Sequence, residues 1–197
     1  MTKALLIIDV QNEYVTGALP ITYPPLSVSL PNIAAAMDAA TAAGHLVVVV
    51  RHTESAAAPI FAEGTPGWTL VDAVADRPHD HLIDKTWPSA FTGTNLAEWL
   101  AAHDVDTVTI AGYMTQHCDE STAREAFHRG LAVEVLSDAT GTLDLANEAG
   151  RVTAEELHRA MLVALHAGFA AVRTTADWIA GGEAVRSNIV ASTRVAP

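Results

Sequence analysis

Short hydrophobic runs that alternate with helical patterns constrain the fold of this chain more than any other feature. Residues 4–8 form one such run, which ends at Asp9, and residues 45–52 form another after a helical pattern over about residues 30–43. Hydrophobic runs of this kind are typical of strands that are buried on both faces, as in parallel sheets. The first 52 residues therefore predict a β-α-β unit.

The alternation continues along the rest of the chain. Further strands are predicted at residues 81–85, 105–113, 131–139 and 170–175, and helices at about residues 94–103, 118–129, 153–168 and around Trp178. Strands that alternate with helices predict an α/β fold whose mostly parallel sheet is covered on both faces. We expect six strands in a doubly wound sheet of order 3-2-1-4-5-6. The irregular stretches at residues 53–79 and 138–152 are expected to form walls of a site.

The composition favours one domain over residues 1–197 and argues against several kinds of partner. Half of the residues are hydrophobic, which is enough for one core. The net charge is −12 and the 11 Lys and Arg residues are scattered, so nucleic acid is not expected as a partner. No hydrophobic run approaches the roughly 20 residues that cross a membrane. A single cysteine and an N-terminus without a signal-peptide pattern favour the cytoplasm.

Three reactive side chains are predicted to meet in one crevice of this sheet. In the expected strand order, strands one and four are neighbours, and ligands bind beyond their carboxyl ends. Asp9 follows strand one, Cys118 follows strand four, and Lys85 closes strand three at the same edge. A cation and a helix N-terminus lower the pKa of a thiol, and a carboxylate accepts its proton. On position alone, a small buried structural cysteine remains the commoner role.

Three segments carry a more specific signal. They are "LLIIDVQNEY" (residues 5–14), "KTWPSAFTGTNL" (residues 85–96) and "IAGYMTQHCDESTAREAFHRGLAVEVLSDAT" (residues 110–140). In order and spacing they resemble the signature blocks of the isochorismatase-like cysteine hydrolases, and the resemblance spans nearly the whole chain. The resemblance implies a three-layer α/β/α sandwich and a catalytic triad of Asp9, Lys85 and Cys118.

The same resemblance implies details of the chemistry. It implies a non-proline cis peptide at Tyr113–Met114 and an oxyanion hole formed by the amides of Met114 and Cys118. For this chain the resemblance implies hydrolysis of a C–N bond in a small amide, lactam or carbamoyl compound, through a covalent thioester on Cys118. Two alternatives remain open: an isochorismatase that cleaves a vinyl ether without the thiol, and a non-catalytic binding protein on the same fold.

The remaining expectations concern the pocket, metals and partners. The aromatic and sulfur-containing residues that flank the signature blocks are candidates for lining the pocket: Tyr14, Trp68, Trp87, Phe91, Tyr113 and Met114. No metal or cofactor is expected, because His52 has no carboxylate two residues before it, unlike the metal-binding motif of nicotinamidases. A small amide is the expected substrate. The resemblance and the apolar pattern of residues 153–169 favour a homodimer or homotetramer.

Overall fold

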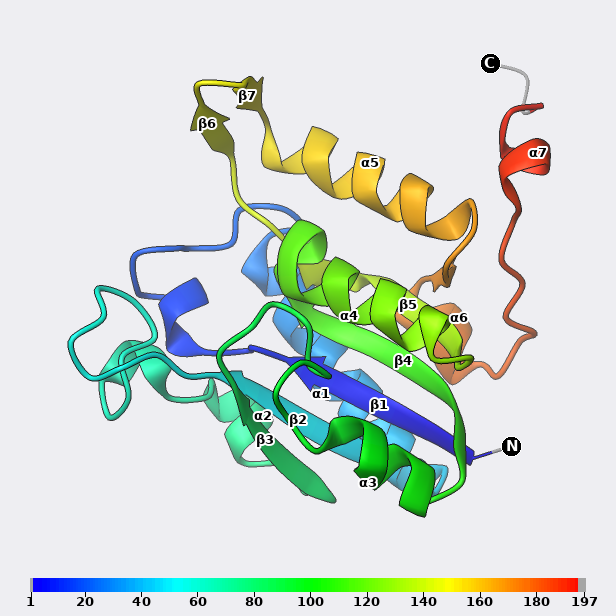
Figure 1. Ribbon diagram of the computed structural model, residues 1–197, viewed down its shortest axis with the longest axis horizontal. Coiled ribbons are helices and arrows are strands. Elements are labelled where there is room, and N and C mark those ends of the chain that lie inside the picture. Colours follow the sequence, from blue (N-terminus) through cyan, green and yellow to red (C-terminus); the bar gives the residue numbers. More distant parts are fainter. Residues whose placement is uncertain (1, 195–197) are drawn as a thin grey trace.

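The computed structural model describes residues 2–194, and a six-stranded parallel sheet forms its centre (Figure 1). The strands are β1 (Thr2–Ile8), β2 (Leu46–His52), β3 (His81–Lys85), β4 (Val105–Tyr113), β5 (Ala132–Gly141) and β8 (Ala171–Arg173). Their order is β3-β2-β1-β4-β5-β8, and every neighbouring pair in the sheet is parallel. Strand β8 is the sixth strand of this sheet along the chain, so the doubly wound order 3-2-1-4-5-6 predicted from the sequence is confirmed.

Helices cover both faces of the sheet and make the three expected layers (Figure 1). One face packs against α1 (Leu26–Ala42), α2 (Asp72–Ala75) and α6 (Thr175–Ile179), and the other against α3 (Leu96–Ala102), α4 (Glu120–His128) and α5 (Ala154–His166). The short helix α7 (Ile189–Ser192) lies near the C-terminus. Single turns of other helix types occur at Asn12–Tyr14 (η1), Pro66–Trp68 (η2) and Thr115–Asp119 (η3, π-helical).

The hydrophobic run in β1 explains why the sheet is covered on both faces. Leu5 and Ile7 belong to the core cluster on the α1 side, whereas Leu6 and Ile8 belong to the cluster on the α4 side, and all four are fully buried. Successive side chains of a strand point to opposite faces, so a strand with helices on both sides needs an uninterrupted hydrophobic run. Each such side chain contributes about 1.5–3 kcal/mol by burial.

Two elements differ from the sequence-based expectation. Helix α1 begins at Leu26, earlier than expected, and carries Pro31 in its interior rather than in its first turn. Leu26 and Leu30 pack against the core cluster, and this burial outweighs the one backbone hydrogen bond that a proline removes. The stretch expected to be irregular, residues 138–152, contains the end of β5 and a hairpin outside the main sheet, β6 (Leu145–Asn147) with β7 (Gly150–Val152).

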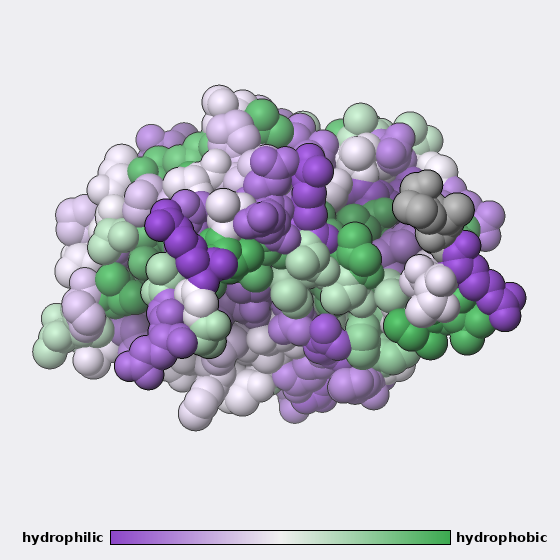
Figure 2. Space-filling model, turned by 90° about the horizontal axis from the view of Figure 1, so that it is seen from above, coloured by the Kyte–Doolittle hydropathy of each residue, from purple (hydrophilic) through white to green (hydrophobic). Residues whose placement is uncertain are grey.

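The surface mixes hydrophilic and hydrophobic side chains. Figure 2 shows both kinds interspersed on the face seen from above. Among the large hydrophobic side chains that are most exposed are Val163 of α5 and Val185, Ile189 and Val190 of the C-terminal segment. Within residues 2–194, no helix is both long enough and apolar enough to cross a membrane.

Candidate active site

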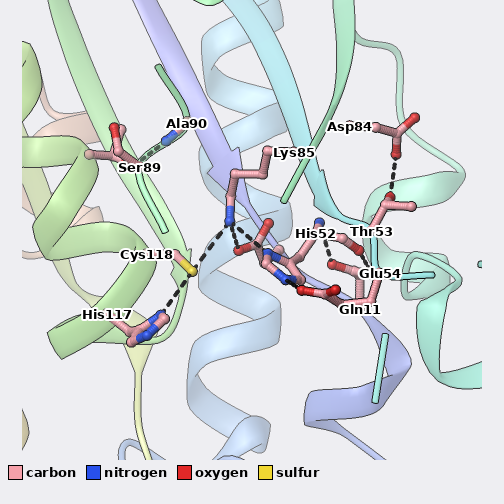
Figure 3. Close-up of polar contacts among 12 residues, drawn as sticks. Gln11, His52, Thr53, Glu54, Asp84, Lys85, Ser89, Ala90, His117 and Cys118 are labelled. Carbon is pink, nitrogen blue, oxygen red and sulfur yellow. Dashed lines mark hydrogen bonds and ion pairs between the residues drawn. The ribbon is translucent and has the colours of Figure 1, made fainter. Parts of the chain in front are cut away.

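The ends of three strands bring Asp9, Lys85 and Cys118 together, as the strand order predicts. Lys85 Nζ lies 2.7 Å from Asp9 Oδ2 and 3.3 Å from Cys118 Sγ (Figure 3). Asp9 directly follows β1, Lys85 is the last residue of β3, and Cys118 lies in η3 after β4. All three residues are at most 2% exposed. A carboxylate, an ammonium group and a thiol thus share one buried site.

The backbone around these residues is unusual at two points. Asp9 has a φ of 52°, a left-handed conformation that is uncommon outside glycine, and its N–H donates to the Val50 carbonyl at 2.8 Å. Opposite it, Gly112 has a φ of 132°, and a Cβ there would lie 2.0 Å from the Ile8 carbonyl oxygen. Only glycine allows β1 and β4 to approach so closely here. The Tyr113–Met114 peptide that follows is cis, as the family resemblance implies.

The pKa of the Cys118 thiol differs from the sequence-based expectation. Burial, followed by the negative charge of Asp9, raises the pKa of the Cys118 thiol, and Lys85 only partly opposes this effect. The sequence-based expectation of a lowered pKa considered Lys85 and the helix N-terminus but not the cost of burying a thiolate. The thiol is therefore neutral at neutral pH in this structure.

The ammonium group of Lys85 has a third neighbour that the sequence did not reveal. Lys85 Nζ lies 3.2 Å from His52 Nδ1, and His52 Nε2 lies 3.0 Å from Glu54 Oε1 (Figure 3). Burial lowers the pKa of Lys85, but the charge of Asp9 and the contact with Cys118 outweigh it, so the pKa is raised and the amine stays protonated. An ammonium group only donates. His52 therefore accepts at Nδ1 and donates from Nε2 to Glu54.

Gln11 holds the backbone that carries His52. Its amide donates to the carbonyl oxygens of His52 at 2.9 Å and Trp68 at 2.8 Å, and its side-chain oxygen accepts from the His52 N–H at 2.8 Å. Gln11 is fully buried, so these hydrogen bonds have no competition from water. The sequence contained this residue in the "DVQN" block without indicating its partner, because the partner is main chain 41 residues away.

Three of these side chains also form a cluster of the types that bind metals. One ligand atom each from Asp9, His52 and Cys118 lies within 4.8 Å of the others. The ammonium group of Lys85 contacts all three of these residues. A positive charge is thus already present among the ligand atoms, and a metal ion at this point would have to displace Lys85.

A cavity of about 330 Å³ lies beside the thiol, at the lower end of the range for small-molecule pockets. Its wall is mainly hydrophobic, with two histidines and one carboxylate. The lining residues are Tyr14, Leu19, His52, Glu54, Ala58, Pro59, Ile60, Phe61, Met114, His117 and Cys118. Several of them come from residues 53–79, the stretch expected from the sequence to form a wall.

The structure brings only some of the predicted pocket residues to this cavity. Tyr14 and Met114 line it. The side chain of Trp87 is directed to solvent, since it is 60% exposed, and Phe91 is buried in the core cluster with β1 and α4. Tyr113 is also buried, and its hydroxyl is 2.8 Å from Ser29 Oγ. Trp68 donates to Thr53 Oγ1 at 2.9 Å and does not line the cavity.

Asp119, the residue after the nucleophile candidate, is a further buried acid. It is fully buried, and neither carboxyl oxygen has a hydrogen-bond partner in the described part of the chain. Burial, and next the charge of Asp9, raise the pKa of this carboxyl well above its usual value. Asp9, and not Asp119, is the acid that forms the ion pair with Lys85.

Comparison with known proteins gives a consistent family assignment. The crystal structure of an isochorismatase-type protein from Burkholderia xenovorans LB400 has a TM-score of 0.96 and 54% identity, over 98% of this chain and 94% of that chain. A secreted isochorismatase effector of Verticillium dahliae is 34% identical over 73% of this chain and 74% of its own length. Nicotinamidase 3 of Arabidopsis thaliana is 33% identical over 85% of this chain and 82% of its own length.

The family model extends over nearly the whole sheet. The isochorismatase domain matches residues 3–177, which include β1 to β8 almost completely and the residues around Cys118. Together with the strand order, the cis peptide and the buried Asp, Lys and Cys, this match leads to one conclusion: the chain belongs to the isochorismatase family of hydrolases.

Proposed function

We propose that this protein is a cysteine hydrolase that cleaves a C–N bond of a small amide, lactam or carbamoyl compound. The observation that carries the proposal is the contact of Lys85 Nζ with both Asp9 Oδ2 and Cys118 Sγ, next to a small cavity that Cys118 lines. Nucleophile, base and cation are the parts that acyl transfer requires. The nicotinamidase among the relatives acts on an amide by its name, which supports the same reaction class.

In the first half of the proposed reaction, Cys118 Sγ attacks the carbonyl carbon while Asp9 accepts the thiol proton. Lys85 stabilises the sulfur as negative charge develops on it. The C–N bond then breaks, Asp9 returns the proton to the leaving nitrogen, and a thioester remains on Cys118. Because the thiol is neutral at rest, a carboxylate within the same site is the group that permits attack at neutral pH.

In the second half, water attacks the thioester carbonyl. Asp9 accepts a proton from this water, the C–S bond breaks, and the proton passes to the departing sulfur. The products are a carboxylic acid and the original thiol. We propose the backbone amides of Met114 and Cys118 as donors to the oxyanion in both halves, since Met114 directly precedes the π-helical turn, Cys118 lies within it, and both residues line the cavity. One such donor contributes about 3 kcal/mol to a transition state.

The proposal is tested by release of ammonia or amine from a panel of small amides, with wild type and Cys118→Ala compared. Cys118→Ala should lose turnover by at least about a thousandfold and keep its circular dichroism spectrum. Retained activity on a vinyl ether such as isochorismate in this variant would favour the isochorismatase alternative. Folded wild type that binds amides without turning over any of them would favour a binding protein.

We also propose self-association into a homodimer or homotetramer and a location in the cytoplasm. Exposed hydrophobic side chains on α5 and the C-terminal segment, such as Val163 and Ile189, support the first proposal. Light scattering coupled to size exclusion measures the mass directly, and a monomer at micromolar concentration would contradict self-association.

The proposed location in the cytoplasm is tested by fractionation of cells that express the full natural gene. Recovery of the protein in the medium would contradict this location.

A further inference from the structure

The charge of the cavity wall points to a substrate class. In the described part of the chain, Glu54 is the acidic residue among those that line the cavity, and no Lys or Arg lines it. The Glu54 side chain is 40% exposed. Its Oε1 is paired with His52 Nε2, and Oε2 makes no hydrogen bond within residues 2–194. A ligand that enters the cavity therefore meets a carboxylate with a spare acceptor.

The nearest cations do not offset this charge. Lys85 has a fully buried side chain, and its ammonium nitrogen contacts Asp9, Cys118 and His52. Arg51 lies over the Trp68 ring, 3.7 Å from its centroid, and is paired with Asp84. Both positive charges are already compensated by a carboxylate. A carboxylate on a ligand would find no free cation to pair with.

The histidines of the wall do not supply a positive charge either. His52 accepts from Lys85 at Nδ1 and donates from Nε2 to Glu54, so neither ring nitrogen is left to donate to an anion. Burial, and next the charge of Lys85, lower the pKa of His117, so its ring is neutral at neutral pH. The net charge of the whole chain, −12, also disfavours the approach of an anion. An anion thus loses hydration on entry and gains only repulsion.

We propose that Glu54 makes this pocket select neutral and cationic amides and reject amides that carry a carboxylate. The inference rests on the proposed function and narrows its substrate class. The body of the ligand would lie against Leu19, Ile60 and Phe61, while a hydrogen-bond donor or an amine faces Glu54. The volume of about 330 Å³ limits the substrate to a small molecule. Isochorismate, which carries two carboxylates, is accordingly a poor fit.

Alkylation of Cys118 tests the pocket charge without requiring turnover. Iodoacetamide and iodoacetate are similar in size and differ by one negative charge. Each forms a C–S bond with Sγ, iodide leaves, and the thiol proton is lost to Asp9 or solvent. The ratio of the iodoacetamide rate to the iodoacetate rate should exceed the same ratio for glutathione by about tenfold. Glu54→Gln, which keeps an oxygen for His52, should bring the ratio close to that of glutathione.

Glu63→Gln is the matched control. Glu63 is exposed, comes from the same loop, does not line the cavity, and gives the same change in net charge. The ratio should stay at the wild-type value in this variant. The inference is overturned if wild type shows the glutathione ratio, or if Glu63→Gln lowers the ratio as much as Glu54→Gln does.

Hydrolysis separates failure of this inference from failure of the proposed function. Benzamide, 4-carbamoylbenzoate and 4-(aminomethyl)benzamide have one ring and one primary amide and differ in charge. We expect kcat/KM for the carboxylate to be at least about tenfold lower than for the other two, and Glu54→Gln to narrow this gap. Equal turnover of all three would overturn the charge selectivity while leaving the hydrolase intact. Absence of turnover throughout, with the alkylation ratios as predicted, would leave the pocket charge standing and count against the proposed function.

Discussion

Asp9 and Lys85 form an ion pair of 2.7 Å between two side chains that are fully buried, although 76 residues separate them in the sequence. The pair is held by the ends of β1 and β3, which lie two strands apart in the sheet. A buried charge without its partner is costly, so removal of either residue leaves an uncompensated charge on the other. Cys118 lies within 3.3 Å of the ammonium group of this pair.

Replacement of Asp9 by Asn should separate the acidity of the thiol from catalysis. Asp9 raises the pKa of Cys118, so its removal lowers that pKa and shifts the pH profile of iodoacetamide labelling toward lower pH. The same change removes the proposed base and should lower kcat by about 10²–10⁴-fold. A profile that moves to higher pH in Asp9→Asn, or unchanged kcat, would contradict the account.

His52 is predicted to position Lys85 through the hydrogen bond at Nδ1. His52→Leu leaves one N–H of the buried ammonium group without an acceptor, and an unsatisfied buried donor costs about 1–3 kcal/mol of free energy. Because Lys85 then shifts away from Cys118, kcat should fall by at least about tenfold. His52→Asn offers an oxygen near the same position and should recover part of kcat. Equal kcat values for the two variants would show that the acceptor is irrelevant to Lys85.

Gln11 is predicted to keep the cavity wall in place. Gln11→Ala removes hydrogen bonds to the backbones of His52 and Trp68, so KM should rise and the melting temperature should fall by about 4–8 °C, equivalent to about 2 kcal/mol in a chain of this length. Gln11→Glu should be at least as damaging, because its carboxylate would face two carbonyl oxygens. Thermal unfolding measures the change in melting temperature and steady-state kinetics measures the change in KM. A Gln11→Glu variant with wild-type stability would argue against the predicted role of these hydrogen bonds.

Glu134 on β5 is predicted to make stability depend on pH. Burial raises the pKa of this carboxyl, but bonds from Thr109, Lys3, Arg173 and Trp178 outweigh it, so the pKa is lowered. A lowered pKa gives stability that is present above the unfolded pKa of about 4.3 and is lost as pH falls through the folded value. Glu134→Gln should cost about 2 kcal/mol of unfolding free energy at pH 7. Urea titrations from pH 7 to pH 3 should show this difference shrinking, whereas a constant difference would contradict the assignment.

The sequence was sufficient for the sheet because each strand carries its own signal. Residues 105–113 and 81–85 were predicted with the bounds that the structure has. The first segment is largely hydrophobic because helices cover both faces of β4, whereas the second is a short edge strand in which buried and exposed residues alternate. The strand order then placed Asp9, Lys85 and Cys118 at one edge. These inferences depend on the succession of strands and helices, which the hydrophobic periodicity of the sequence indicates.

The parts that the sequence did not reveal depend on where side chains point. The His52–Glu54 pair and the hydrogen bonds from Gln11 to the backbone of His52 depend on side-chain orientations that the periodicity of the sequence does not encode. Trp87 lies inside a signature block, two residues from Lys85, yet its side chain faces solvent. The raised pKa of Cys118 follows from the depth of burial, which proximity to Lys85 in a topology diagram does not report.

The most direct test of the central claim is the mass of the peptide that contains Cys118 after turnover of a good amide substrate is quenched with acid. We predict an increase equal to the acyl group of that substrate, located on Cys118 and removed by hydroxylamine, as expected for a thioester. Rapid turnover of the same amide by wild type and by Cys118→Ala, with no acylated peptide at any quench time, would contradict the account.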